Sequence, residues 1–260
     1  MKDPGADSHG ANRTVRYLNV VSSARPCKRS LAYNMEVAIV GIVPAAGYAT
    51  RLQSLRCSKE VYPIGGRPVM DYLMERMRLA GSSEIRVVTR PEKLDVVENA
   101  SRHAATTVVE GYPRSLAESC FTGMKGIGDD DTVLLGFPDS IWEPRDGFLN
   151  VIDLLGGGCK IALGLFHTSE PQRCEVVTLS DPSYGLVASI ELRPPAPTSS
   201  LIWGCAAARA SVLRGLERER EPGEYFRSFC PQGAVAGVWL SDTYVDIGTR
   251  EGLREALAMR

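Results

Sequence analysis

The sequence predicts a three-layer α/β fold built on a mainly parallel sheet. Three observations support this prediction. Apolar runs of strand length alternate with helix-like segments from residue 36 to about residue 166. The first run, EVAIVGIV (36–43), is almost wholly apolar, as expected for a strand that is covered on both faces. The length of 260 residues is enough for one large domain or two small ones.

The predicted elements follow each other regularly through the first two thirds of the chain. After the first strand we expect a helix at 68–80, a strand at 84–89, a helix at 91–101, a strand at 106–110, a helix at 115–127, a strand at 131–136, a helix in FLNVIDLL and a strand at 159–166. Beyond about residue 170 the alternation weakens. We expect strands in CEVVTLS, YGLVASIEL and SLIWGCAAA, a helix in SVLRGLERER, a hairpin-like pair of GAVAGVWL with TYVDIG, and a closing helix.

The ends and the bulk composition limit the possible functions. Residues 1–34 are polar and without periodicity, which predicts a flexible extension or upstream sequence before a start at Met35, with a partner-binding arm as the alternative. Lys and Arg number 30 against 31 Asp and Glu, and this balance disfavours nucleic acid as a partner. No apolar run has membrane-spanning length and no secretory signal is visible, so we expect a cytoplasmic protein without a membrane partner. The 7 cysteines contain no C-x-x-C pair, which favours reduced thiols over a zinc site.

The strongest candidate for a binding site begins where the first strand ends. The small residues of Pro44-Ala45-Ala46-Gly47 let backbone N–H groups come close to a ligand, and a nucleotide fits the carboxyl end of a parallel strand. Arg51 and Lys59 add positive charge for phosphate oxygens. By itself the pattern also fits a tight turn with two solvated cations. It matches neither G-x-x-x-x-G-K-[ST] nor G-x-G-x-x-G, which argues against a P-loop NTPase and a dinucleotide dehydrogenase.

The stretch GIVPAAGYATRLQSLRCSKEVYPIGGRPVMDYLMERM resembles the opening of the sugar-1-phosphate nucleotidylyltransferases of the glucose-1-phosphate thymidylyltransferase type. Their pattern is G-x-G-T-R-L, then Pro-Lys, then Leu-Pro. The resemblance implies a Rossmann-like three-layer α/β/α nucleotidyltransferase fold with a mostly parallel mixed sheet. It places the domain at 35–260, with a nucleotide-binding half at about 35–145 and an acceptor-binding half at about 146–260.

The same resemblance implies roles for the opening segment. Arg51 would bind the triphosphate and stabilise departing pyrophosphate, and Lys59 would reach the α-phosphate. The nucleotide would lie against the loop residues Pro44, Ala45, Ala46, Gly47, Tyr48, Ala49 and Thr50. Two departures from the family pattern stand out: Ala49 replaces the second glycine of the loop, and Ser58 replaces the proline before the lysine.

Two aspartates are candidates for a magnesium site. Asp139 follows the buried strand LLG and resembles the aspartate of the family's G-D-x motif, while Asp246 in YVDIGT resembles that of W-x-D-x-G-T. Each aspartate alone could be a turn or helix-capping residue. Together with substrate phosphates and waters, two carboxylates are what Mg²⁺ prefers.

The resemblance also suggests residues that read the base and the acceptor. Glu110 aligns with the base-reading glutamine, but a carboxylate only accepts hydrogen bonds, so the base stays open. Ser115 begins the segment that matches the family's G-[LT]-A helix start. Arg193 stands at the lysine that holds the acceptor phosphate, and Glu175 at a sugar-contacting glycine. Leu192 replaces a hydroxyl-binding glutamate, which points to a modified sugar, a cyclitol phosphate or a phosphonate as acceptor.

The predicted function is transfer of NMP from an NTP to a phosphorylated small molecule, with a sugar 1-phosphate as the first candidate, Mg²⁺ as cofactor and pyrophosphate as product. One alternative is a cytidylyltransferase for a phosphonate, cyclitol phosphate or alcohol phosphate. Another is a non-catalytic nucleotide-binding regulator. A glycosyltransferase is disfavoured because the usual Asp-x-Asp is missing: Ser140-Ile141 follow Asp139. The sequence leaves the base, the acceptor and a homo-oligomeric state open.

Overall fold

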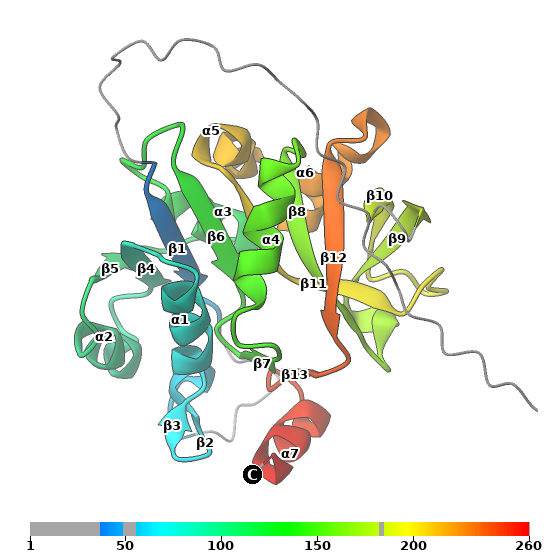
Figure 1. Ribbon diagram of the computed structural model, residues 1–260. Coiled ribbons are helices and arrows are strands. Elements are labelled where there is room, and N and C mark those ends of the chain that lie inside the picture. The colour runs from blue at the N-terminus through cyan, green and yellow to red at the C-terminus, as the bar shows by residue number, and fades with distance from the viewer. Residues whose placement is uncertain (1–36, 49–55, 182–184, 260) are drawn as a thin grey trace, which may run out of the picture. The chain divides into compact units, whose positions relative to one another are not determined.

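The computed structural model describes residues 37–48, 56–181 and 185–259 (Figure 1). By its internal contacts the chain divides into two units, 1–35 and 36–260. The expected N-terminal extension (1–34) lies outside the described residues.

A nine-stranded sheet forms the centre of the described residues, with the order β5-β4-β1-β6-β11-β8-β12-β10-β9. Its strands are β1 (Ile39–Pro44), β4 (Glu84–Thr89), β5 (Thr106–Glu110), β6 (Thr132–Gly136), β8 (Ile161–His167), β9 (Glu175–Asp181), β10 (Leu186–Leu192), β11 (Leu201–Arg209) and β12 (Val235–Ser241). Strands β5, β4, β1 and β6 are parallel, as are β8 and β12. β11 runs antiparallel between β6 and β8, and β10 runs antiparallel to β12 and β9. The predicted mixed sheet is confirmed.

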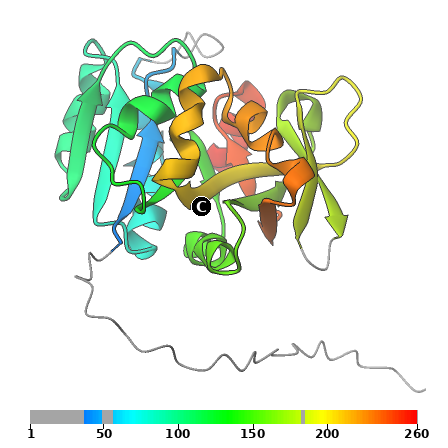
Figure 2. The same cartoon turned by 90° about the horizontal axis from the view of Figure 1, so that it is seen from above.

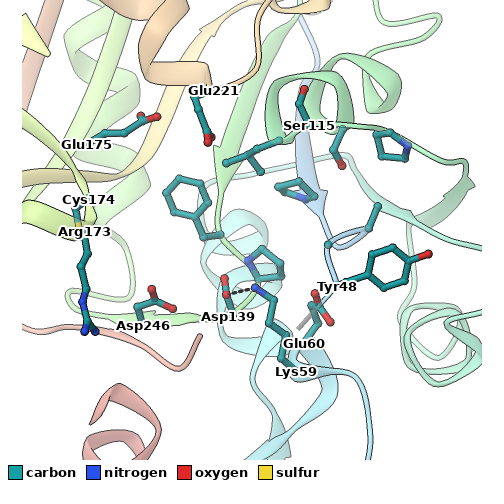
Figure 3. Close-up of a pocket in the computed structure, with 18 of the residues that line it drawn as sticks. Tyr48, Lys59, Glu60, Ser115, Asp139, Arg173, Cys174, Glu175, Glu221 and Asp246 are labelled. Atoms are coloured by element: carbon teal, nitrogen blue, oxygen red, sulfur yellow. Dashed lines mark hydrogen bonds and ion pairs between the residues drawn. The ribbon is translucent and has the colours of Figure 1, made fainter. Parts of the chain in front are cut away.

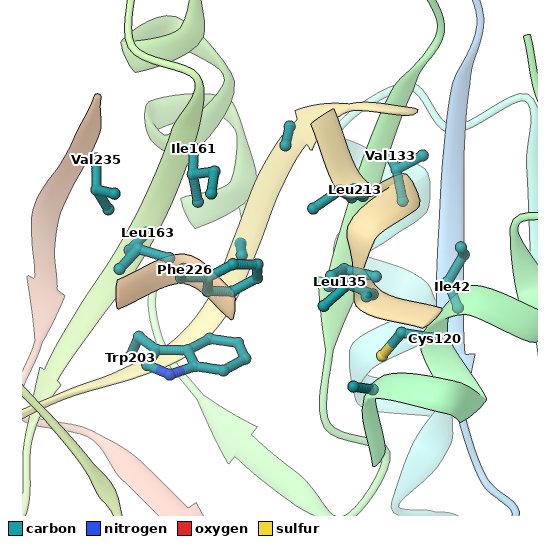
Figure 4. Close-up of a cluster of buried hydrophobic side chains, with 14 of the residues drawn as sticks. Ile42, Cys120, Val133, Leu135, Ile161, Leu163, Trp203, Leu213, Phe226 and Val235 are labelled. Atoms are coloured by element: carbon teal, nitrogen blue, oxygen red, sulfur yellow. The ribbon is translucent and has the colours of Figure 1, made fainter. Parts of the chain in front are cut away.

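Helices cover both faces of this sheet, and two hydrophobic cores result (Figures 1 and 2). One face carries α1 (Met70–Leu79), α2 (Leu94–Ser101) and α4 (Gly147–Gly156), whose buried residues include Met77, Val96 and Phe148. The opposite face carries α3 (Leu116–Gly123), α5 (Ala210–Leu213) and α6 (Pro222–Arg227). In Figure 4, Cys120, Leu213 and Phe226 from these helices lie over the strand residues Ile42, Leu135 and Leu163. The three-layer arrangement predicted from the sequence is thus confirmed.

Short elements complete the described chain. They are β2 (Pro63–Ile64) paired with β3 (Arg67–Pro68), β7 (Ser140–Trp142), β13 (Tyr244–Asp246), α7 (Arg250–Ala258) and the 3-10 turns η2 (Lys59–Val61), η3 (Pro171–Arg173), η4 (Arg214–Arg218) and η5 (Cys230–Gln232). The expected hairpin of GAVAGVWL with TYVDIG is wrong. β12 joins the central sheet beside β8, whereas β13 pairs with β7 about a hundred residues earlier in the chain.

The lengths of the helices and the state of the cysteines relate to where the protein resides. Within the described ranges, none of the helices is both long and apolar enough to cross a membrane. The cysteines of the described residues are free thiols, three of them buried: Cys120, Cys205 and Cys230.

Candidate active site

A cavity of about 480 Å³ lies beside the carboxyl ends of β1 and β6 (Figure 3). Its opposite wall comes from β9 and β11. Ten of the residues that the sequence singled out line it: Pro44, Ala46, Gly47, Tyr48, Lys59, Ser115, Asp139, Glu175, Arg193 and Asp246. The structure therefore brings together residues from both predicted halves of the domain.

The other predicted site residues lie elsewhere. Ala45 is fully buried beneath the loop, where its backbone N–H donates to the Val88 carbonyl at 2.7 Å. Glu110 is exposed at the end of the edge strand β5. It does not line the cavity, so the structure gives no support to the base-reading role that the resemblance implied for it. Ala49, Thr50 and Arg51 lie outside the described residues.

A short two-stranded ladder holds the two aspartates together. β13 pairs antiparallel with β7 so that Asp246 is opposite Ser140, and the Ile247 N–H donates to the Asp139 carbonyl oxygen at 2.9 Å. A methyl group added at Gly248 would lie 2.9 Å from Asp246 Oδ1 and 3.1 Å from Asp139 Oδ2. Both carboxylates therefore flank the same small space, although 107 positions of sequence number separate 139 from 246.

Lys59 reaches this space from η2. Its ammonium group forms an ion pair with Asp139, and Figure 3 shows the two side chains meeting beside Asp246. Burial by itself would lower the pKa of Lys59, but the carboxylates of Asp139 and Glu60 outweigh burial and raise that pKa. Lys59 is thus a permanent cation at the end of β6.

The donor set suits Mg²⁺. Asp139 and Asp246 offer oxygen ligands only, which a hard cation such as Mg²⁺ prefers. In the part of the chain that the structure describes, no group of three or more His, Cys, Asp or Glu side chains could enclose a metal. Two carboxylates leave the other coordination positions to substrate phosphates and waters, as is usual for Mg²⁺ at phosphate-transfer sites.

Two basic residues that the sequence analysis missed hold the small-residue loop. Arg90 Nε donates to the Ala46 carbonyl at 2.8 Å, and its guanidinium carbon lies 4.2 Å from the centre of the Tyr48 ring. Lys93 Nζ donates to the Ala45 carbonyl at 2.7 Å. Both residues follow β4 at its carboxyl end. The rule that located Asp139, a polar residue just after a buried strand, would have found them too.

The wall of the cavity that β9 and β11 form combines acids, a cation and aromatic rings. Trp203 Nε1 donates to Glu175 Oε2 at 2.6 Å, and Arg193 pairs with Glu221 at 2.7 Å. Burial raises the pKa of Glu175 to about 7, and repulsion from Glu221 adds to the increase. The Phe137 ring lies 5.0 Å from that of Trp203, so aromatic surface faces the cavity between the aspartates and Glu175. Glu221 is the N-cap of α6, and no periodic pattern in the sequence marks it as a residue of the site.

Ser115 has a structural task as well as a place in the wall. It is the N-cap of α3, where its hydroxyl accepts from the Glu118 N–H at 3.1 Å. The helix therefore begins at the cavity edge because Ser115 satisfies one of its free N–H groups.

A central sheet between helices, with a cavity beside the carboxyl ends of β1 and β6, is the arrangement in which open α/β proteins bind their ligands. Residues 41–163 match the family model of the MobA-like NTP transferase domain. The low-salt glycan biosynthesis nucleotidyltransferase Agl11 of Haloferax volcanii is 26% identical over 171 residues, which cover 62% of this chain and 46% of that protein. A glucose-1-phosphate thymidylyltransferase of Neisseria meningitidis is 26% identical over 241 residues, covering 83% of this chain and 80% of that protein.

A solved UDP-glucose pyrophosphorylase of Acinetobacter baumannii has the same fold, with a TM-score of 0.71 and 17% identity over 85% of this chain and 92% of that chain. The resemblance to the sugar-1-phosphate nucleotidylyltransferases that the sequence suggested is therefore confirmed, in the relatives and in the fold. The chain spans about half the length of the Haloferax relative and four fifths of the Neisseria relative.

Proposed function

We propose that the cavity binds an NTP and a phosphorylated small-molecule acceptor and transfers NMP to the acceptor with release of pyrophosphate. One observation carries the proposal: Lys59, Asp139 and Asp246 come from three distant segments and meet at one wall of the cavity. The relatives named as thymidylyltransferases and as a UDP-glucose pyrophosphorylase support a sugar 1-phosphate as the first acceptor to examine.

In this proposal the triphosphate lies against the β1 side of the cavity, along Ala46, Gly47 and Tyr48. Arg51, placed by sequence alone, contacts the pyrophosphate portion. The acceptor lies towards Glu175 and Arg193. When bound to Asp139 and Asp246, Mg²⁺ would neutralise phosphate charge.

The chain itself has mainly to position and stabilise charge. An oxygen of the acceptor phosphate forms a bond to the α-phosphorus, the bond from that phosphorus to the bridging oxygen breaks, and the electron pair leaves with pyrophosphate. The attacking oxygen is already ionised at neutral pH, so no general base is needed. Lys59 supplies a fixed ammonium group beside the reacting phosphates, which is the kind of preorganised charge that lowers such barriers.

A second candidate is a cytidylyltransferase for a phosphonate, cyclitol phosphate or alcohol phosphate. The acceptor wall bears on the acceptor of this candidate and not on its base: the carboxylate of Glu175 accepts from Trp203, and Arg193 pairs with Glu221. A wall of this composition differs from one lined by free hydroxyl-binding groups.

The test is a matrix of four NTPs against sugar 1-phosphates, a cyclitol phosphate, an alcohol phosphate and a phosphonate, with Mg²⁺ present and pyrophosphate as readout. Asp139→Asn serves as the blank. We expect release above the blank for one NTP with one class of acceptor. Binding of NTP without pyrophosphate release from any combination would reject the enzyme and favour a nucleotide-binding regulator.

A further inference from the structure

Residues at the start of helix α2 form hydrogen bonds with Ser58 and Glu60, the two residues that flank Lys59 in the chain. These α2 residues lie outside the cavity wall. Asp95 accepts from the Ser58 backbone N–H at 2.7 Å through Oδ2 and from the Ser58 hydroxyl at 2.8 Å through Oδ1. On the other side of Lys59, Lys93 Nζ donates to Glu60 Oε2 at 2.7 Å. Neither Lys93 nor Asp95 lines the cavity.

The geometry points to Asp95 and Lys93 as positioning residues that set where the Lys59 ammonium lies in the proposed reaction. This inference rests on the proposed function. Asp95 and Lys93 would contact no substrate, and they would affect the reaction only through the position of Lys59.

The contacts of Lys93 also tie Lys59 to the small-residue loop. The same ammonium group that binds Glu60 donates to the carbonyls of Ala45 at 2.7 Å and Gly47 at 3.2 Å. The Glu60 side chain is 1% exposed and that of Lys93 10%. Since the buried Lys93 ammonium binds Glu60 Oε2 and two loop carbonyls at once, it holds the loop and the Lys59 segment at a fixed separation.

Asp95 fixes the orientation of Ser58, the residue that precedes Lys59. Both oxygens of its carboxylate accept hydrogen bonds from one residue, so Ser58 can neither slide nor rotate without losing a contact. Burial would raise the pKa of Asp95, but the hydrogen bonds from Ser58 outweigh burial and lower it, so the carboxylate stays ionised at neutral pH. Hydrogen bonds to an ionised group are the stronger kind.

Helix α2 is a rigid support for these contacts. Val96 and Ala100 are fully buried against the sheet. Asn99 Nδ2 donates to Asp71 Oδ1 at 2.8 Å, which fixes the helix to α1 on the side away from the cavity. Asp71 therefore provides a matched control, because it is also an aspartate that binds α2 but it forms no hydrogen bond or ion pair with residues 58–60.

The test is a double-mutant cycle on pyrophosphate release by the full chain. We expect Asp95→Asn to lower kcat about tenfold, the effect of one strong hydrogen bond, and to leave the KM for NTP within about twofold. In a Lys59→Met background the same substitution should change kcat less than about twofold, because its effect passes through Lys59. Asp71→Asn should leave kcat within about twofold in both backgrounds.

Equal loss of kcat from Asp95→Asn in both backgrounds would overturn the inference, since general damage to the fold acts whether or not Lys59 is present. If Asp95→Asn does not fold, as judged by thermal unfolding, Ser58→Ala takes its place, because it removes the hydroxyl contact and keeps the backbone one.

A second readout separates failure of the inference from failure of the proposed function. Limited acetylation with acetic anhydride, followed by mass spectrometry, measures the reactivity of the Lys59 amine without any substrate. We expect Asp95→Asn to increase acetylation of Lys59 several-fold and Asp71→Asn to leave it unchanged. If wild-type protein releases no pyrophosphate but this pattern holds, the reaction is wrong and the positioning role stands. An unchanged Lys59 reactivity in Asp95→Asn overturns the positioning role.

Discussion

At the scale of single residues, Lys59 and Asp139 form the centre of the candidate site. Their ion pair is largely buried, with side-chain exposures of 21% and 13%. We expect Asp139→Asn to lower turnover by roughly two to three decades, as for loss of one preorganised electrostatic contact. Steady-state pyrophosphate release measures this effect, with circular dichroism to confirm the fold.

Asp129→Asn is the control for this substitution. Asp129 also pairs with a cation, Arg214, at 3.0 Å, but its side chain is 72% exposed and lies away from the cavity. Exposed pairs contribute little, so activity should stay within about twofold. Turnover by Asp139→Asn at the level of this control would remove Asp139 from the site.

Glu175 leads to a prediction about pH. Its pKa of about 7 in the folded protein exceeds its ordinary value of 4.5, so the folded state holds a proton that the unfolded state releases. The free energy of unfolding should therefore fall as pH rises from about 4.5 to about 7 and then level off. Glu175→Gln, which stays neutral, should remove up to about 3 kcal/mol of this fall.

Urea unfolding of wild type and Glu175→Gln at pH 5 and pH 8 measures how the free energy of unfolding of each protein changes with pH. At pH 5 the two should be similar in stability, and at pH 8 the variant should be the more stable, because wild type then carries a buried charge next to Glu221. A variant that loses the same free energy as wild type between these pH values would show that Glu175 titrates normally.

At the scale of elements, the junction of β13 with α7 sets the position of Asp246. The Thr249 hydroxyl caps α7 by accepting from the Gly252 N–H at 3.0 Å. A Cβ on Gly252 would lie 1.9 Å from the Asp246 carbonyl oxygen, which is part of the backbone and cannot turn aside. Gly252→Ala should therefore displace Asp246, lower turnover at least about tenfold and cost about 1–3 kcal/mol of stability.

Gly156 supplies the comparison for this helix substitution. It also lies in a helix, α4, but a Cβ there meets nothing within 4 Å. Gly156→Ala should keep wild-type turnover and gain roughly 0.5–1 kcal/mol, since alanine restricts the unfolded chain more than glycine does. Wild-type turnover in both variants would mean that the β13–α7 junction does not govern the site.

The same junction shows which elements the sequence could predict. Continuous apolar runs located β1 and β6, because strands buried on both faces carry that pattern wherever their neighbours lie. The pattern of TYVDIG identified a strand but not its partner. Pairing with β7 depends on contacts between segments about a hundred residues apart, which local periodicity does not encode.

At the scale of the whole molecule, the nucleotide side of the site was more predictable than the acceptor side. Parallel strands bring their carboxyl ends to one edge, so residues just after β1 and β6 had to lie close together, and Asp139 lies there. On the side of the proposed acceptor, β9 and β10 are antiparallel, and Glu221 reaches the cavity from the N-cap of α6. No sequence pattern predicts that Glu221 lies near Glu175. Only the three-dimensional structure places the two carboxylates in the same cavity.

Ligand binding in the cavity should increase the free energy of unfolding of the whole domain. A ligand that binds only the folded state stabilises it by about 2.7 kcal/mol at a hundred times its Kd. For a domain of this size that free energy corresponds to an increase of roughly 5–10 °C in Tm. We expect the correct NTP with Mg²⁺ to produce such an increase in wild-type protein.

The dependence on metal is the discriminating part of this prediction. Asp139 and Asp246 flank one space, and a triphosphate brought there without a metal ion would be repelled by two carboxylates, a repulsion that Lys59 offsets only in part. The increase in Tm should therefore fall by more than half in EDTA, and Asp246→Asn should make the remaining increase insensitive to EDTA. Differential scanning fluorimetry measures all four conditions. Equal increases with and without metal in wild-type protein would show that the two aspartates do not hold Mg²⁺ beside the bound nucleotide.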